Sequence, residues 1–190
     1  MSGTDSVRLA RTSDVDDVAD VQVRAWRASY AGILPSAFLD ALDPSDIALE
    51  WGRALLNPGP GRLLVATDGE GTVVGAASAS PSPDPDAHGA GEIGLLVVDP
   101  QRWGAGHGSR LLAACVDLLV SAGHGDVLVW IPLEDAARRS FLQSAGFGPD
   151  GAYRDLVAGV DPATDEDVTV REVRLASAIV DRAEETASPT

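Results

Sequence analysis

The chain has 190 residues, of which 45% are hydrophobic and 23% are charged, and these values suit a single soluble globular domain. Its 14 basic residues, all of them arginine, face 29 acidic residues. The resulting net charge of −15 argues against nucleic acid or an anionic membrane surface as a partner. The single cysteine, Cys115, excludes an internal disulfide framework, and the N-terminus lacks the apolar run of a secretory signal. We therefore expect a cytoplasmic protein.

The first half of the chain predicts short strands and amphipathic helices. Residues 6–10 are expected to form a strand. A Thr/Ser/Asp cluster then caps a helix whose apolar residues recur at helical spacing, namely Val15, Val18, Val21 and Ala25. After a turn that contains glycine and proline, we expect one second helix over residues 36–56. Residues 62–80 predict a hairpin with an Asp-Gly turn, and a loop rich in Pro, Asp and Gly follows it.

The second half predicts strands and helices in alternation. Residues 92–98, EIGLLVV, are almost continuously apolar, which is typical of a strand buried on both faces. An amphipathic helix, a second buried strand at 126–131, another helix and a late alternating strand at 168–176 follow. This order indicates a mixed α/β (α+β) fold with at least one parallel strand–helix–strand unit. We expect residues 1–177 to form one domain and residues 178–190 to form a partly disordered tail.

The stretch PQRWGAGHGSRLL places Gly104, Gly106 and Gly108 between that first buried strand and the helix after it. The first amides of a helix have no partner within the helix, and glycine lets the backbone approach an anion without a Cβ clash. We therefore predict a phosphate-binding loop rather than a turn that only needs flexibility. A Walker loop is excluded because the chain has no lysine, and the dinucleotide fingerprint fails because Ser109 stands where its third glycine belongs.

Four segments in this order resemble the GNAT acyltransferase superfamily: WRASYAGILPSAFL, LLVATDGEGTVVGAA, the glycine stretch and RRSFLQSAGF. The resemblance implies a GNAT-like fold, with a twisted mixed sheet of about six or seven strands and about four flanking helices. It also implies that two central strands splay apart beside a bulge near Leu95 and Leu96. Acetyl-CoA, or another short acyl-CoA, is the implied co-substrate, and no metal is implied.

The resemblance also indicates how the co-substrate would be held. The pantetheine arm would pair with the backbone of the central strand like an added strand, and the pyrophosphate would rest on the glycine loop. The residues implied in cofactor binding are Leu96, Val97, Val98, Trp103, Gly104, Ala105, Gly106, His107, Gly108 and Ser109.

Transfer to an amine needs a base that takes the proton of the amine. Glu92 opens the central strand where some family members have a glutamate base, and a surface glutamate at a strand edge is the alternative interpretation. His88, in the preceding loop near the expected acceptor mouth, is a second candidate, although a solvated loop histidine is the commoner case. Trp26 and Tyr30 fall where the family places its acceptor wall, and packing in the core of an amphipathic helix is the alternative for both.

The general acid is missing from its usual place. Many family members carry a tyrosine four residues before the glycine of Gly-Phe, and this chain has Leu142 there. Tyr153, in the following strand, is the candidate that could replace it, unless it is a structural aromatic and the CoA thiolate leaves unaided. Asp135 likewise stands where an asparagine is common.

We therefore expect an acyltransferase that moves an acetyl group from acetyl-CoA to a small, potentially cationic amine by direct attack in a ternary complex. A noncatalytic acyl-CoA sensor, which Leu142 favours, is one alternative. An enzyme that acetylates protein N-termini or lysines is another, because an acidic protein is compatible with basic substrates. The sequence leaves open whether the protein forms a homodimer.

Overall fold

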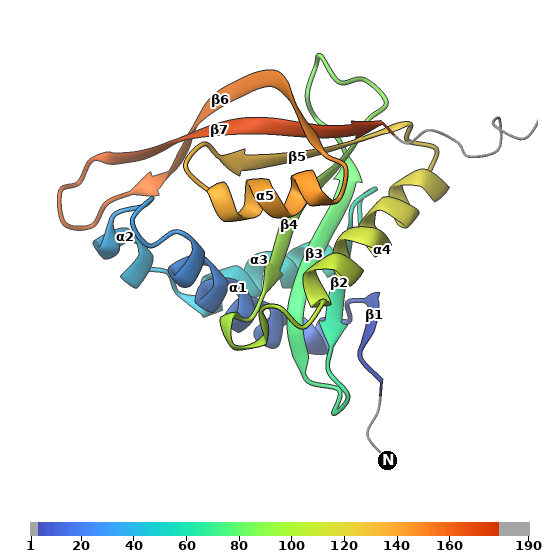
Figure 1. The fold of residues 1–190 in the computed structure, drawn as a ribbon. Helices are drawn as coiled ribbons and strands as arrows, with labels where there is room; N and C mark the ends of the chain where they lie inside the picture. The colour runs from blue at the N-terminus through green and yellow to red at the C-terminus, as the bar shows by residue number, and fades with distance from the viewer. Residues whose placement is uncertain (1–3, 179–190) are drawn as a thin grey trace, which may run out of the picture.

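The computed structural model describes residues 4–178, so the predicted tail lies outside the described residues from position 179 onwards. The strands are β1 (Ser6–Leu9), β2 (Arg62–Thr67), β3 (Val73–Pro81), β4 (Gly91–Val98), β5 (Asp126–Pro132), β6 (Gly148–Val160) and β7 (Asp167–Ala178). They form one seven-stranded sheet in the order β1-β2-β3-β4-β5-β7-β6 (Figure 1). Neighbouring strands are antiparallel except β4 and β5, which run parallel because a helix crosses between them. The sheet therefore has the mixed topology that the sequence predicts.

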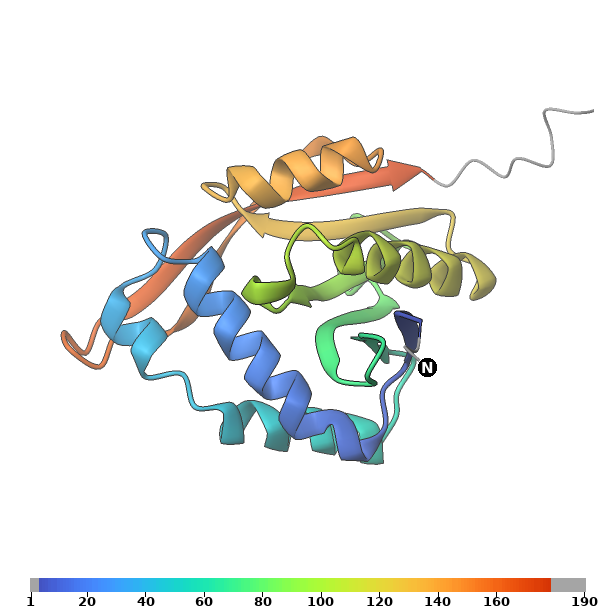
Figure 2. The ribbon, with the colours of Figure 1, turned by 60° about the horizontal axis from the view of Figure 1, so that its bottom comes forward.

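Helices cover both faces of the sheet. Within the described residues they are α1 (Val15–Ser29), α2 (Ser36–Asp40), α3 (Pro44–Leu56), α4 (His107–Ser121) and α5 (Ala136–Ser144). Figure 2 shows α1 and α3 on one side of the sheet and α4 and α5 on the other. Each face encloses its own apolar cluster, one beneath α1 and the other between the sheet, α4 and α5. Two helix layers and the sheet between them therefore bury the core.

The single helix predicted over residues 36–56 is two helices, which is why the fold has five helices where about four were expected. Helix α2 ends at Asp40, and α3 begins at Pro44. Proline has no N–H and disfavours a helical conformation in the residue before it, so the chain breaks there. Asp43 has extended backbone and caps α3, since its Oδ1 accepts a hydrogen bond from Ser45 N at 2.8 Å.

Strand β4 carries the bulge that the sequence prediction places near Leu95. Ser78 of β3 is opposite Leu95 and the next residue, Ala79, is opposite Ile93, so Gly94 is the extra residue. A bulge bends its strand and increases its twist. The bend lies in the half of β4 that diverges from β5, so the irregularity shapes the centre of the sheet.

Gly91, at the start of β4, lies against α4 so closely that a Cβ there would be 2.6 Å from Cδ2 of Leu119. Because Leu119 is itself buried, Gly91→Ala should destabilise the fold by about 1–3 kcal/mol through overpacking, measured as a lower Tm. Gly125→Ala is the matched control, since a Cβ there meets nothing within 4 Å. Equal melting temperatures for the two variants would contradict this account of the α4 contact.

Candidate active site

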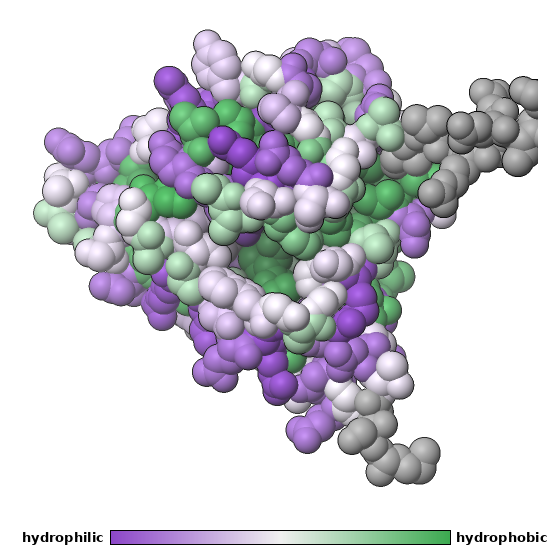
Figure 3. All heavy atoms as spheres, in the orientation of Figure 1, coloured by the Kyte–Doolittle hydropathy of each residue, from purple (hydrophilic) through white to green (hydrophobic). Residues whose placement is uncertain are grey.

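The central strands part after two pairs of residues. Gly91 is opposite Val127 and Glu92 is opposite Leu128, and the register between β4 and β5 ends there. One backbone edge of β4 is therefore open along most of its length. A cavity of about 560 Å³ lies beside this edge, between α1, the glycine loop and α5. Figure 3 shows a hollow with a largely apolar floor near the centre of this face.

Most of the residues predicted to bind the cofactor line this cavity. Ala105 is not part of its wall. The others are, namely Leu96, Val97, Val98, Trp103, Gly104, Gly106, His107, Gly108 and Ser109. The open edge of β4 and the glycine loop thus form one continuous surface.

Two glycines give the loop its shape. Gly104 has φ = 77° and Gly106 has φ = 82°, a left-handed conformation that residues with a Cβ rarely adopt. Gly106 is the N-cap of α4, and no side chain caps the helix there. The first amides of α4 are therefore free for an anion in the cavity, at the positive end of the helix dipole.

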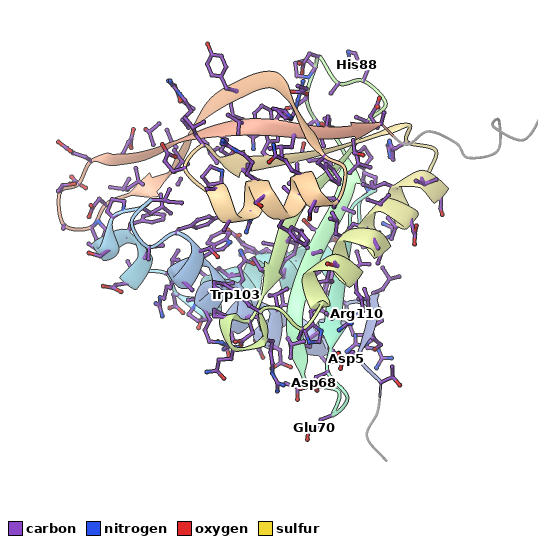
Figure 4. All side chains as sticks on the ribbon, viewed as in Figure 1. Asp5, Asp68, Glu70, His88, Trp103 and Arg110 are labelled. Carbon is purple, nitrogen blue, oxygen red and sulfur yellow. The ribbon has the colours of Figure 1, made fainter. Side chains whose placement is uncertain are left out.

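Side chains hold the loop from behind (Figure 4). Arg110 Nη2 donates hydrogen bonds to Ala105 O at 3.3 Å and to Asp5 Oδ2 at 2.7 Å. The same nitrogen lies 3.1 Å from Nδ1 of the buried His107, and because arginine only donates, Nδ1 is the acceptor. Trp103 Nε1 donates to Val98 O at 2.8 Å and ties the loop to the end of β4. His107 therefore supports the loop through Arg110.

The α5 wall supplies two polar side chains that the sequence analysis did not assign to binding. Asp135 is only 6% exposed and caps α5, since its Oδ1 accepts a hydrogen bond from Arg138 N at 2.9 Å. Its Oδ2 has no hydrogen-bond partner among the described residues, and Arg138 Nε lies 3.6 Å away. An unpaired buried carboxylate oxygen is unfavourable, so this site suits a ligand N–H. An amide-bearing arm such as pantetheine fits that requirement.

Glu92 stands where the two strands part. Ser82 Oγ donates a hydrogen bond to Glu92 Oε2 at 3.1 Å. Burial raises the pKa of Glu92, and the nearby carboxylates of Asp84 and Glu172 raise it further, while the Ser82 hydrogen bond and Arg154 lower it. A carboxylate whose pKa is raised in this way is suited to take a proton near neutral pH.

An arginine that the sequence analysis missed anchors the loop beside Glu92. Arg174 of β7 is 7% exposed and donates hydrogen bonds to Asp84 at 3.1 Å, to Asp86 at 2.9 Å and to Asp150 at 2.7 Å. Trp130 Nε1 also donates to Asp84 at 3.0 Å. The loop that carries Ser82 is therefore fixed to the sheet. Arg174 belongs to an ordinary alternating strand, so no local pattern marks it.

The two predicted acceptor-wall residues have different surroundings. Trp26 and Tyr30 lie one turn apart on α1, with ring centroids 6.1 Å apart. Trp26 packs against the apolar cluster beneath α1. Tyr30 lies next to α5, where Cζ of Arg138 is 5.8 Å from its ring centroid, and burial raises the pKa of its phenol. Tyr30 therefore contacts Arg138 of the cavity wall without lining the cavity itself, whereas Trp26 is partly buried against the core.

His88 and Tyr153 lie outside the wall of the cavity, and so does Glu92. His88 is exposed on the loop before β4, at the opposite end of the molecule from Arg110 (Figure 4). Tyr153 is 68% exposed on the edge strand β6, with Cζ of Arg171 at 5.6 Å from its ring centroid. Leu142, at the position where many family members have tyrosine, is fully buried in the core. The chemical roles assigned to His88 and Tyr153 stay predictions.

Three other features were considered: a metal site, a membrane-spanning helix and a nucleophilic cysteine. Within residues 4–178, His, Cys, Asp and Glu side chains do not gather in threes or more as a metal ion would require. In the same part of the chain, none of the helices has the length and apolarity needed to traverse a bilayer. Cys115 is buried in α4, and burial raises the pKa of its thiol to about 12, so it is a packing residue and not a nucleophile.

Residues 22–147 match the sequence profile described as the acetyltransferase (GNAT) family. The uncharacterized N-acetyltransferase YuaI of Bacillus subtilis is 30% identical over 157 residues, which cover 82% of this chain and 87% of the relative. PaiA N-acetyltransferase of Thermoplasma acidophilum, solved in complex with coenzyme A, has a TM-score of 0.67 at 15% identity over 92% of this chain and 99% of that one. YncA of Salmonella typhimurium, solved with acetyl-CoA, has a TM-score of 0.65 at 19% identity over 98% and 100%. These two structures share the fold.

Gly108 allows a test of the anion site without backbone strain. It lies in the first turn of α4, and a Cβ there would be 3.7 Å from Phe141 Cζ and from Val98 Cγ2, which is ordinary contact. Gly108→Glu should weaken the binding of CoA by about 10- to 100-fold, because its carboxylate would repel the pyrophosphate. Calorimetry measures the affinity, and Gly108→Gln is the neutral control of the same size. Equal affinities for the two variants would argue against an anion at this loop.

Proposed function

This chain belongs to the acetyltransferase (GNAT) family, and we propose that it transfers the acetyl group of acetyl-CoA to the nitrogen of an amine by direct attack in a ternary complex. The observation that carries the proposal is the open edge of β4. It joins an anion-binding glycine loop at the end of the strand to a half-buried carboxylate, Glu92, at its start.

In the proposed complex, acetyl-CoA follows β4. Its pyrophosphate lies on the amides of residues 104–109, and its pantetheine arm pairs with the strand around Leu96 and Val98 as an added strand would. Asp135 Oδ2 accepts a hydrogen bond from an amide of the arm. The printed descriptions of PaiA with coenzyme A and of YncA with acetyl-CoA support this choice of ligand.

Glu92 is the proposed base. Its carboxylate takes the proton of the amine, directly or through water, and the free nitrogen attacks the thioester carbon. Asp84 and Glu172 also act on Glu92, but Arg174 and Arg154 pair with them. Glu92 makes no ion pair among the described residues, so its own carboxylate favours an acceptor that arrives as a cation. A small cationic amine is therefore the proposed acceptor.

A noncatalytic acyl-CoA sensor is the second candidate, because Leu142 leaves α5 without a hydroxyl at the usual place. Thiol release from acetyl-CoA in the presence of a panel of amines separates the candidates. Turnover supports the enzyme, and tight binding without turnover supports the sensor. Peptides in the same panel test whether the acceptor is a protein N-terminus or a lysine.

Glu92→Gln keeps the size of the side chain but removes the basic carboxylate. We expect kcat to fall by roughly 10²–10⁴-fold while the affinity for acetyl-CoA barely changes. In the wild type, kcat/KM should rise with pH as Glu92 ionises, and this rise should lie above the usual range of a glutamate because burial raises its pKa. The loss in Glu92→Gln should shrink at high pH, where free amine forms without help.

Ser82→Ala tests whether the rise of kcat/KM with pH reports the ionisation of Glu92. It removes the hydrogen bond that lowers the pKa of Glu92, so the rise of kcat/KM should move to higher pH. An unchanged kcat/KM at neutral pH in Glu92→Gln would remove Glu92 from the mechanism.

Tyr153→Phe tests whether the exposed tyrosine of β6 supplies a proton to the leaving thiol. Because Tyr153 does not line the cavity, we expect kcat to stay within a few-fold of the wild type. A fall of about 100-fold or more in steady-state turnover would show that Tyr153 acts as the general acid.

A further inference from the structure

Acetyl transfer releases CoA as a thiolate, and the usual position on α5 offers no hydroxyl to stabilise it. Leu142 is fully buried in the core, and Tyr153 lies on the edge strand. Arg138, one helical turn before Leu142, does line the cavity. It is one of two arginines in the largely apolar wall of the cavity, and the other, Arg102, pairs with Asp68.

Arg138 spans the gap between α5 and the open edge of β4. Its Nη2 donates a hydrogen bond to Leu96 O at 3.3 Å, in the stretch of β4 that β5 does not pair. Its Cζ lies 5.8 Å from the centroid of the Tyr30 ring on α1. The guanidinium therefore lies between the strand that would hold the pantetheine arm and the proposed acceptor wall. In the proposed complex, the thioester lies in this region.

The guanidinium is held loosely for a side chain that is only 18% exposed. Arginine has five N–H donors. Within the described residues, the side chain of Arg138 makes one hydrogen bond to the backbone and also interacts with the Tyr30 hydroxyl, whose pKa it acts to lower. Asp135 Oδ2, at 3.6 Å from Nε, is beyond hydrogen-bond distance. The titratable groups next to it are Asp135, which precedes α5, and Tyr30, which follows α1. Most of its donors are therefore available to a ligand.

We propose that Arg138 stabilises the CoA thiolate as it leaves, an inference that rests on the proposed acetyl transfer. The cationic acceptor first loses one proton to Glu92, and its free nitrogen then forms the new C–N bond. The C–S bond breaks with its electron pair going to sulfur, and the nitrogen gives its second proton to water. Arg138 keeps its own protons, because a guanidinium is not deprotonated in proteins. It contributes a positive charge and hydrogen bonds to sulfur. The released thiolate takes its proton from water.

The test measures the thiol of bound CoA directly, through the ultraviolet absorbance of the thiolate as the pH is raised. In wild-type protein saturated with CoA, the pKa of this thiol should lie below that of free CoA. Arg138→Gln should raise the pKa of the bound thiol by about 1 or more. It should also lower kcat by roughly 10²–10³-fold, while Arg138→Lys, which keeps the charge, should lose less.

Arg139→Gln is the matched control, because Arg139 is half-buried on the same helix, does not line the cavity, and donates from its Nη2 to Leu133 O at 2.6 Å. It should leave both the thiol pKa and kcat unchanged. An unchanged thiol pKa in Arg138→Gln that still binds CoA would overturn the role of Arg138 and leave the proposed function standing. A normal kcat at saturating acetyl-CoA with a raised KM would overturn it too, because Arg138 would then only bind the cofactor. Wild-type protein that binds no CoA would instead contradict the proposed function itself.

Discussion

The separation of β4 from β5 is the constraint on which the site depends. Buried backbone N–H and C=O groups need partners, and a parallel pair of strands normally continues for that reason. Here the pairing stops after Glu92, beside a bulge at Gly94 that bends β4. The open edge of β4 then faces a cavity, and an extended ligand with amide groups satisfies it. In the proposed complex the substrate completes the sheet, and its length sets the distance between the anion loop and the reacting carbon.

The protein carries a net charge of −15, yet the proposed co-substrate is a polyanion. Arginines around the glycine loop do not resolve this conflict, because carboxylates already engage them: Arg24 with Asp99, Arg102 with Asp68 and Arg110 with Asp5. In the proposed complex, the free amides and the dipole of α4 bind the anion, because they add local positive potential without any charged side chain. Arg138 differs from these arginines in having a weak partner, and this difference leaves it available for chemistry.

The charge environment differs between the two ends of β4. At the glycine loop the backbone attracts an anion, whereas around Glu92 carboxylates outnumber the arginines that approach them. Arg174 pairs with Asp84 and Asp86 of the loop that carries Ser82 and with Asp150 of β6, so these aspartates already neutralise its positive charge. Glu92 is thus left half-buried with a raised pKa, which makes it a stronger base than an exposed glutamate. An amine that arrives as a cation is attracted by the carboxylate at this end, and the proton that it must lose can pass to Glu92.

The sequence by itself determined the glycine loop and the order of the elements apart from the break before Pro44, because these features depend on local periodicity and backbone freedom. The splayed central pair was implied by the family resemblance alone. The break before Pro44 was also local, but apolar spacing on both sides hid it. Only the tertiary structure decided the polar partners. Arg174 meets Asp84 across 90 residues of sequence, and Arg138 meets Leu96 across 42. It also decided that Tyr153 lies at an exposed edge, because β6 pairs outside β7, and strand order is a matter of packing that no periodic pattern specifies.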